Sequence, residues 1–194
     1  LLESRGLGDV YKRQGLDFCN KIAVLNRGKS DQEYPKFILY NKSDTPKRPE
    51  NLKKYHNVLK ELIKGCQLLQ KNKCKFIVMP CNTAHYWQED IQKKISIPLI
   101  SMPKEVYLHA KKTCKKNSKI GILCTEATIK TKVYSKYFDK SFQLVSPGKK
   151  LQKNSVNKAI KFVKMGRVKD AEKVLKQAVN LSLIHISEPT RLQQ

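Results

Sequence analysis

Residues 76–85, Phe76-Ile77-Val78-Met79-Pro80-Cys81-Asn82-Thr83-Ala84-His85, carry an apolar run that stops at a proline and a polar turn. Short apolar runs bounded by turn residues are typical of buried strands in parallel sheets. Helical spacing of apolar residues begins near Ala84. The stretch therefore predicts a strand, a turn that carries Cys81, and a helix. Either Asn82 or Thr83 is expected to cap that helix.

The rest of the chain alternates between similar apolar runs and amphipathic stripes. The expected helices are 18–25 (the tail of a helix), 52–70, 84–95, 104–115, 127–138, 155–165 and 168–179. The expected strands are 37–40, 75–79, 97–102, 119–124 and 142–146. Strands that alternate with helices of this length predict βαβ units, so we expect an α/β fold with parallel sheets. Residues 100–104, flanked by prolines, are the expected junction between two lobes.

The two ends of the chain are complementary when written as DNA. Codons CTG, TCT, CTT, ATA and CAC encode residues 181–185, and their reverse complements encode residues 14 back to 10. The correspondence extends over residues 1–14 and 181–194, and its middle resembles the translated transposase-end adapter of sequencing libraries. We expect both segments to be adapter artefacts that play no part in the native fold. Residues 15–180 are then the native piece, expected to be cut at both ends.

Composition argues against a nucleic-acid partner despite the net charge of +24. Lysine dominates that charge, and between residues 15 and 180 the arginines are Arg27, Arg48 and Arg167. Proteins that contact phosphates and bases favour the bidentate arginine side chain. Because the lysines are spread evenly, we expect a basic solvated surface. A lysine-rich nucleic-acid-binding module is a distant alternative.

No run approaches the roughly 20 apolar residues that span a membrane, so no membrane partner is expected.

The six cysteines form no CxxC pair and no cluster with zinc-like spacing, so no metal is expected. Several lie in apolar stretches, which suits free thiols in a reducing cytoplasm better than disulfides. Cys81 is the one placed for chemistry, because N–H groups at a helix start lower a thiol pKa and bind carboxylates. From the residues alone, a thiolate base or nucleophile and a buried structural cysteine fit Cys81 equally well.

The segment PCNTAH at residues 80–85, followed by Ile97-Pro98-Leu99-Ile100, resembles the aspartate/glutamate racemase superfamily, and most of all its aspartate racemase branch. Four further segments match family elements in the same order: 17–22, 40–48, 120–134 and 164–166. The resemblance implies two Rossmann-like lobes with parallel sheets, related by pseudo-symmetry. The first lobe would be 15–101, without its first strand, and the second an incomplete 102–180.

The resemblance also implies cofactor-independent racemisation of aspartate or glutamate by two cysteines, in a protein that is a homodimer. Inversion requires an acid and a base on opposite faces of the α-carbon, and Cys81 matches the first of them. Arg48 and Lys164 match positions that hold carboxylates, which suits their charges. The other substrate-binding positions implied are Asn82, Thr83, Thr125 and Thr128. His85 is expected to pack or hydrogen-bond rather than to catalyse.

Two family motifs do not occur in this sequence: a glycine-rich GGMGP loop before the first helix and a GCTE motif that carries the second cysteine. Cys124-Thr125-Glu126 echoes the latter but falls on a second-lobe strand, so Cys124 is expected to be a core thiol. We therefore expect this chain to lack racemase activity. Maleate isomerases and arylmalonate decarboxylases of the same superfamily are the enzyme alternative, and an ordinary solvated lysine is the alternative for Lys164.

Overall fold

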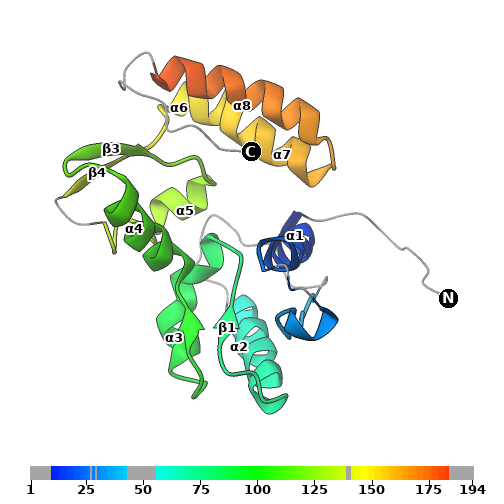
Figure 1. Cartoon of the computed structure of the whole chain (residues 1–194). Helices are drawn as coiled ribbons and strands as arrows, with labels where there is room; N and C mark the ends of the chain where they lie inside the picture. Colours follow the sequence, from blue (N-terminus) through cyan, green and yellow to red (C-terminus); the bar gives the residue numbers. More distant parts are fainter. Residues whose placement is uncertain (1–9, 27, 29, 43–55, 139–140, 184–194) are drawn as a thin grey trace.

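A computed structural model describes residues 10–26, 28, 30–42, 56–138 and 141–183. Short strands alternate with helices along this part of the chain, and both sheets are parallel (Figure 1). Strand β1 (Ile77–Val78) pairs with β2 (Leu99–Ile100). Strand β3 (Ser118–Gly121) pairs with β4 (Phe142–Val145). The α/β class with parallel sheets, predicted from the alternation, is confirmed.

Helical elements precede strand β1 or lie between β1 and β2 in sequence. These elements are α1 (Val10–Leu25), the 3-10 turn η1 (Asp31–Glu33), α2 (His56–Lys71), the 3-10 helix η3 (Thr83–Trp87) and α3 (Gln88–Gln92). The core joins α2 and α3 to the sheet and consists of Val58, Cys66, Ile77, Trp87, Ile91, Ile95 and Leu99. Val58 and Ile91 are completely buried. Burial of this apolar surface is what holds the short strands between the helices.

The β3–β4 sheet is accompanied by a second group of helices. They are α4 (Met102–Thr113), α5 (Glu126–Lys130), α6 (Lys149–Leu151), the π-helical turn η4 (Gln152–Val156), α7 (Asn157–Lys164) and α8 (Val168–Leu183). Gly166, with a φ of 77°, ends α7 in the left-handed conformation that glycine adopts without strain. The chain then reverses, and α8 packs beside α7 (Figure 1). In the described ranges, no helix has the length and apolar character needed to cross a membrane.

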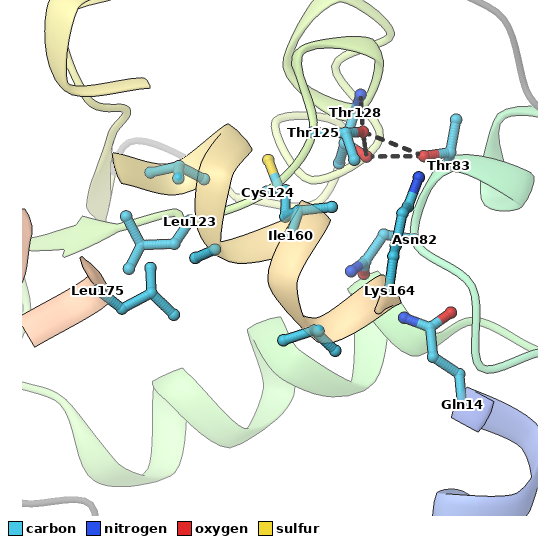
Figure 2. Close-up of a pocket in the computed structure, with 13 residues that line it drawn as sticks. Gln14, Asn82, Thr83, Leu123, Cys124, Thr125, Thr128, Ile160, Lys164 and Leu175 are labelled. Carbon is cyan, nitrogen blue, oxygen red and sulfur yellow. Dashed lines mark hydrogen bonds between the residues drawn. The ribbon is translucent and has the colours of Figure 1, made fainter. Parts of the chain in front are cut away.

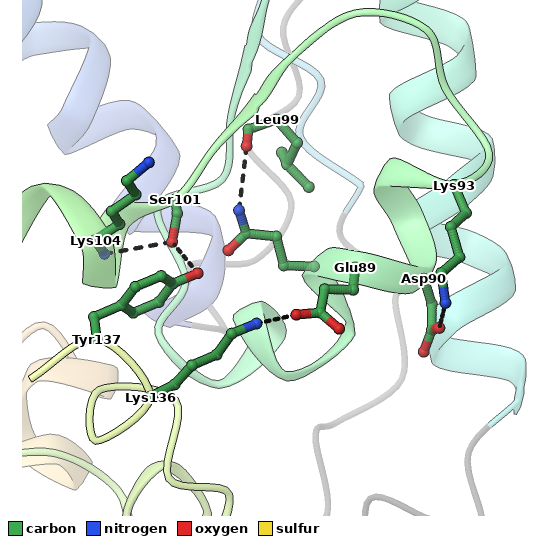
Figure 3. A network of polar contacts seen from close by, with 9 residues as sticks. Glu89, Asp90, Lys93, Leu99, Ser101, Lys104, Lys136 and Tyr137 are labelled. Carbon is green, nitrogen blue, oxygen red and sulfur yellow. Dashed lines mark hydrogen bonds and ion pairs between the residues drawn. The ribbon is translucent and has the colours of Figure 1, made fainter.

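Two side-chain contacts join the region of the first sheet to the segment after α5. Ser101 Oγ donates to the hydroxyl of Tyr137 at 3.0 Å, and Lys136 forms an ion pair with Glu89 (Figure 3). The lysine and glutamate side chains are 49% and 70% exposed, so their pairing contributes little to stability. The partly buried contact of Ser101 with Tyr137 is the more constraining of the two.

Three sequence-predicted elements differ from the structure. Residues 37–40 were expected to be a strand but have no regular structure, and within the described ranges no strand lies beside them to complete a ladder. The helix expected at 84–95 ends at Gln92, whose side-chain amide bonds the backbone of Ile97 and Leu99. The helix expected at 127–138 stops at residue 130, because Lys132 adopts a φ of 53°.

We predict that Ile91→Ala lowers the free energy of unfolding by about 2–5 kcal/mol, because it empties a fully enclosed site in the core. Urea titration followed by circular dichroism measures the change. Leu68→Ala is the matched control, since Leu68 lies on α2 and is 44% exposed. An equal loss in the two variants would contradict the placement of the core.

Candidate active site

The turn after β1 fixes the backbone of Cys81 in place. Its N–H donates to the carbonyl of Met79 at 2.7 Å, which closes a tight three-residue turn around Pro80. The fixed φ of proline suits this central position. Cys81 is 7% exposed. The strand therefore delivers a buried thiol at its carboxyl end, where parallel sheets place their ligand-binding groups.

The imidazole of His85 holds the other side of the same turn. Its Nδ1 lies 2.8 Å from the carbonyl oxygen of Cys81, and its Nε2 accepts from the N–H of Met102 at 3.1 Å. Because Nε2 is an acceptor, the ring proton sits on Nδ1 and the imidazole is neutral. Burial lowers the pKa of His85, against the opposing effect of the hydrogen bond to Cys81. His85 thus ties the Cys81 turn to the start of α4, in the hydrogen-bonding role expected for it.

Three hydroxyl groups meet beside this turn and form a threonine cluster (Thr83, Thr125 and Thr128). Thr83 Oγ1 lies 3.0 Å from that of Thr128 and 3.3 Å from that of Thr125. The remaining pair is 3.0 Å apart. Thr125 also caps α5 by accepting from the N–H of Thr128 at 3.2 Å. Each hydroxyl both donates and accepts, so the cluster is a polar surface that can adapt to a ligand.

The predicted capping of the helix by Asn82 or Thr83 is wrong. Asn82 occupies the position before η3 but makes no side-chain capping bond. Its Oδ1 instead accepts from the hydroxyl of Tyr134 at 2.5 Å, while Thr83 bonds within the threonine cluster. Both side chains therefore reach segments more than 40 residues away in sequence. Local capping is lost because these distant partners hold the same oxygen atoms.

A cavity of about 220 Å³ opens beside these groups (Figure 2). Its described lining comprises Gln14, Asn82, Thr83, Leu123, Cys124, Thr125, Thr128, Val156, Ala159, Ile160, Val163, Lys164 and Leu175. One wall is apolar and comes mainly from η4 and α7, and the opposite edge is polar. In Figure 2 the side chain of Lys164 extends along the cavity toward the threonine cluster. The cavity thus combines a cation, an amide and three hydroxyls at one edge.

The structure brings together five of the seven site residues expected from the sequence: Asn82, Thr83, Thr125, Thr128 and Lys164. Cys81 directly precedes Asn82, but the cavity wall formed by the described residues does not include it. Arg48 lies outside the described residues. Within those residues no group of three or more histidine, cysteine or acidic side chains could hold a metal ion.

Cys124 lines the cavity as a buried thiol, and burial raises its pKa to about 11. A thiol with that pKa stays protonated at neutral pH, which suits the core role expected for it. Two other features were not predicted from the sequence: the apolar wall supplied by Val156 and Ile160, and the bond from Tyr134 to Asn82. Tyr134 lies inside a matched family segment, but a match in sequence does not tell which group it contacts.

Comparison with known proteins shows similarity to amino-acid racemases. The sequence profile of the Asp/Glu/Hydantoin racemase family matches residues 15–183. A broad specificity amino-acid racemase of Bacillus subtilis is 31% identical over 121 residues, which are 62% of this chain and 50% of that protein. A glutamate racemase of Persephonella marina is 30% identical over 111 residues, 57% of this chain and 42% of that protein. The chain therefore spans half or less of the curated relatives that it matches.

Solved structures give the same result. An aspartate racemase of Picrophilus torridus superposes with a TM-score of 0.71 at 25% identity, covering 90% of this chain and 72% of that one. An aspartate racemase homologue from Pyrococcus horikoshii superposes with a TM-score of 0.67 at 19% identity, covering 88% and 75%. The second likeness concerns the fold alone.

We predict that His85 makes the stability of the chain depend on pH. Since its pKa is lowered in the folded state, the unfolded chain binds the proton first as the pH falls. Wild-type stability should therefore fall between about pH 7.5 and about pH 5.5, by at most about 1.4 kcal/mol per pH unit from this residue. Urea unfolding across the range measures the slope.

In His85→Asn that part of the slope should vanish. His109→Asn, which removes an exposed imidazole from α4, should keep the wild-type slope. Identical pH profiles for all three proteins would contradict the buried neutral state of His85.

Proposed function

The chain belongs to the Asp/Glu/hydantoin racemase family, and on that premise we propose that it is part of an amino-acid racemase acting on aspartate or glutamate. The observation that carries the proposal is the polar edge of the cavity. Asn82, the threonine cluster and Lys164 meet there, directly after the turn that holds Cys81. Hydrogen-bond donors and a cation on one edge suit a carboxylate. A thiol beside such a group suits removal of the adjacent α-proton.

In the proposed reaction, the thiolate of Cys81 removes the α-proton and becomes a thiol. The electron pair left on the α-carbon delocalises into the α-carboxylate, which hydrogen bonds from the polar edge stabilise. A second thiol on the opposite face then donates a proton to the α-carbon and becomes a thiolate. The proposal requires no cofactor. Since the sequence contains no GCTE motif for that second thiol, the chain as given is proposed to be inactive in net racemisation.

The proposed substrate is a small amino acid with two carboxylates. Lys164, and Arg48 from outside the described residues, would hold the carboxylates. Cytoplasmic location and a homodimer in the whole protein stay predictions from the sequence.

We predict that this chain catalyses exchange of the α-proton of aspartate or glutamate with solvent, but no net racemisation. Cys81 can return a deuteron to the face from which it removed the proton, whereas inversion needs a group on the other face. Proton NMR in D2O measures the exchange, and chiral chromatography measures the inversion. Cys81→Ser should abolish the exchange, and Cys114→Ser, a cysteine at the end of α4, should retain it.

Exchange that survives Cys81→Ser would remove Cys81 from the mechanism. Sustained racemisation by the purified chain would contradict the need for a second cysteine. Conversion of maleate, or decarboxylation of an arylmalonate, in place of amino-acid exchange would move the protein to another activity of the superfamily.

We also predict that Lys164→Met raises the Kd for aspartate about tenfold or more, because hydrogen bonds to charged groups contribute about 1.5–3 kcal/mol. Isothermal titration calorimetry measures the affinity. Lys161→Met is the matched control, since Lys161 is an exposed lysine one turn earlier on α7. If the two variants bind alike, Lys164 is one of the solvated lysines of the surface.

A further inference from the structure

The hydroxyl of Tyr134 bonds to Asn82, the cavity residue that directly follows Cys81. It donates to Oδ1 of Asn82 at 2.5 Å, from a position 52 residues later in the chain. We propose that Tyr134 is a positioning residue, which holds Oδ1 of Asn82 so that the amide presents its N–H donors to a substrate carboxylate. This inference rests on the proposed function and deepens it, since it assigns the chemical group that Asn82 contacts.

The chemistry of the amide makes the orientation consequential. An asparagine side chain has an acceptor on one side and two donors on the other, and the two sides are almost identical in shape. The wrong orientation would therefore fit the same space while turning an acceptor toward the ligand. A fixed donor at Oδ1 determines which side faces Tyr134, and the Nδ2 side is left for the cavity that Asn82 lines.

Tyr134 is suited to act as that donor throughout the physiological pH range. Burial raises the pKa of Tyr134 to about 12. The phenol therefore keeps its proton. The contact also lies in a half-buried setting, where hydrogen bonds are stronger than in water.

The orientation of the Asn82 amide determines which part of the substrate Asn82 contacts. An amide that presents its N–H groups can donate to a carboxylate. It disfavours an ammonium group, because the amide N–H and the ammonium N–H are both donors. Asn82 then belongs to the same anion-binding edge as Lys164, which lines the cavity with it. The substrate ammonium must be held by other groups.

The test uses the whole chain with two probes: aspartate, and succinate, which has both carboxylates but no ammonium. Calorimetry should show that Tyr134→Phe raises the Kd for succinate about tenfold, as expected for a hydrogen bond to a charged group whose geometry is lost. Tyr137→Phe is the matched control. It removes another phenol that bonds across the molecule, to Ser101, but it lies away from the cavity lining.

Two further variants separate positioning from general stability. In an Asn82→Ala background, Tyr134→Phe should cause no additional loss, because the tyrosine acts only through the asparagine. Asn82→Asp should bind succinate more weakly than Asn82→Ala, because it turns a negative oxygen toward the carboxylate. Amide NMR of the unliganded chain gives a second readout, in which Tyr134→Phe should move the Asn82 side-chain resonance while Tyr137→Phe leaves it in place.

An unchanged Asn82 resonance in Tyr134→Phe would overturn the inference, whatever the stability of the variant. So would Asn82→Asp binding succinate as well as the wild type, because an acceptor would then face the ligand. Either result leaves the proposed function standing if wild-type chain binds aspartate. A wild-type chain that binds neither probe would overturn the proposed function and this inference together.

Discussion

The arrangement of the site depends on hydrogen bonds that leave the helix after β1 without a cap. Asn82 and Thr83 stand where a capping side chain would bond to the first turn of η3, yet their oxygen atoms bond to Tyr134, Thr125 and Thr128. Loss of a cap costs helices about 1 kcal/mol. The same bonds join the ends of β1 and β3, which belong to different sheets. Bonds between the two halves of the chain thus replace the local cap where these halves form a common cavity.

The difference between local capping and bonds to distant residues also explains which parts of the structure could be predicted from the sequence. Short apolar runs that end at turn residues predicted all four strands that pair, because such a run is a local pattern in the sequence. The expected strand at residues 37–40 has the same local pattern but no partner within the described chain, and pairing is a property of distant segments. The capping prediction failed for the same reason. Likewise, the resemblance supplied the positions of Asn82 and the threonines, whereas their contacts and the apolar wall depend on the folded chain.

Cys81 and Cys124 are both buried and both follow a strand, but their surroundings differ. Cys124 lies in the cavity wall, where loss of solvation raises its pKa to about 11, so that the thiol stays protonated at neutral pH. Cys81 is just as buried, but its backbone is held both at its N–H, by Met79, and at its carbonyl, by His85. The backbone of Cys124 is held at its carbonyl, which accepts from Gln152 at 3.0 Å. Proton transfer needs a donor and acceptor in fixed geometry more than it needs exposure. The two cysteines therefore differ in how their backbone is held, although their residue type and burial are the same.

Surroundings also distinguish Lys164 from the other lysines of the chain. A net charge of +24 spreads lysines over most of the surface, where water and salt screen them. Lys164 differs in its surroundings, since it lies beside an apolar wall formed by residues such as Val156 and Ile160. An apolar wall excludes water and lowers the effective dielectric constant, so an anion in the cavity interacts more strongly with this ammonium group than with one on the surface. Hydroxyls and amides among the described lining residues share this edge of the cavity and can orient a ligand there. The preference of the cavity for a carboxylate would then follow from where one lysine is placed, and the many lysines elsewhere contribute little to it.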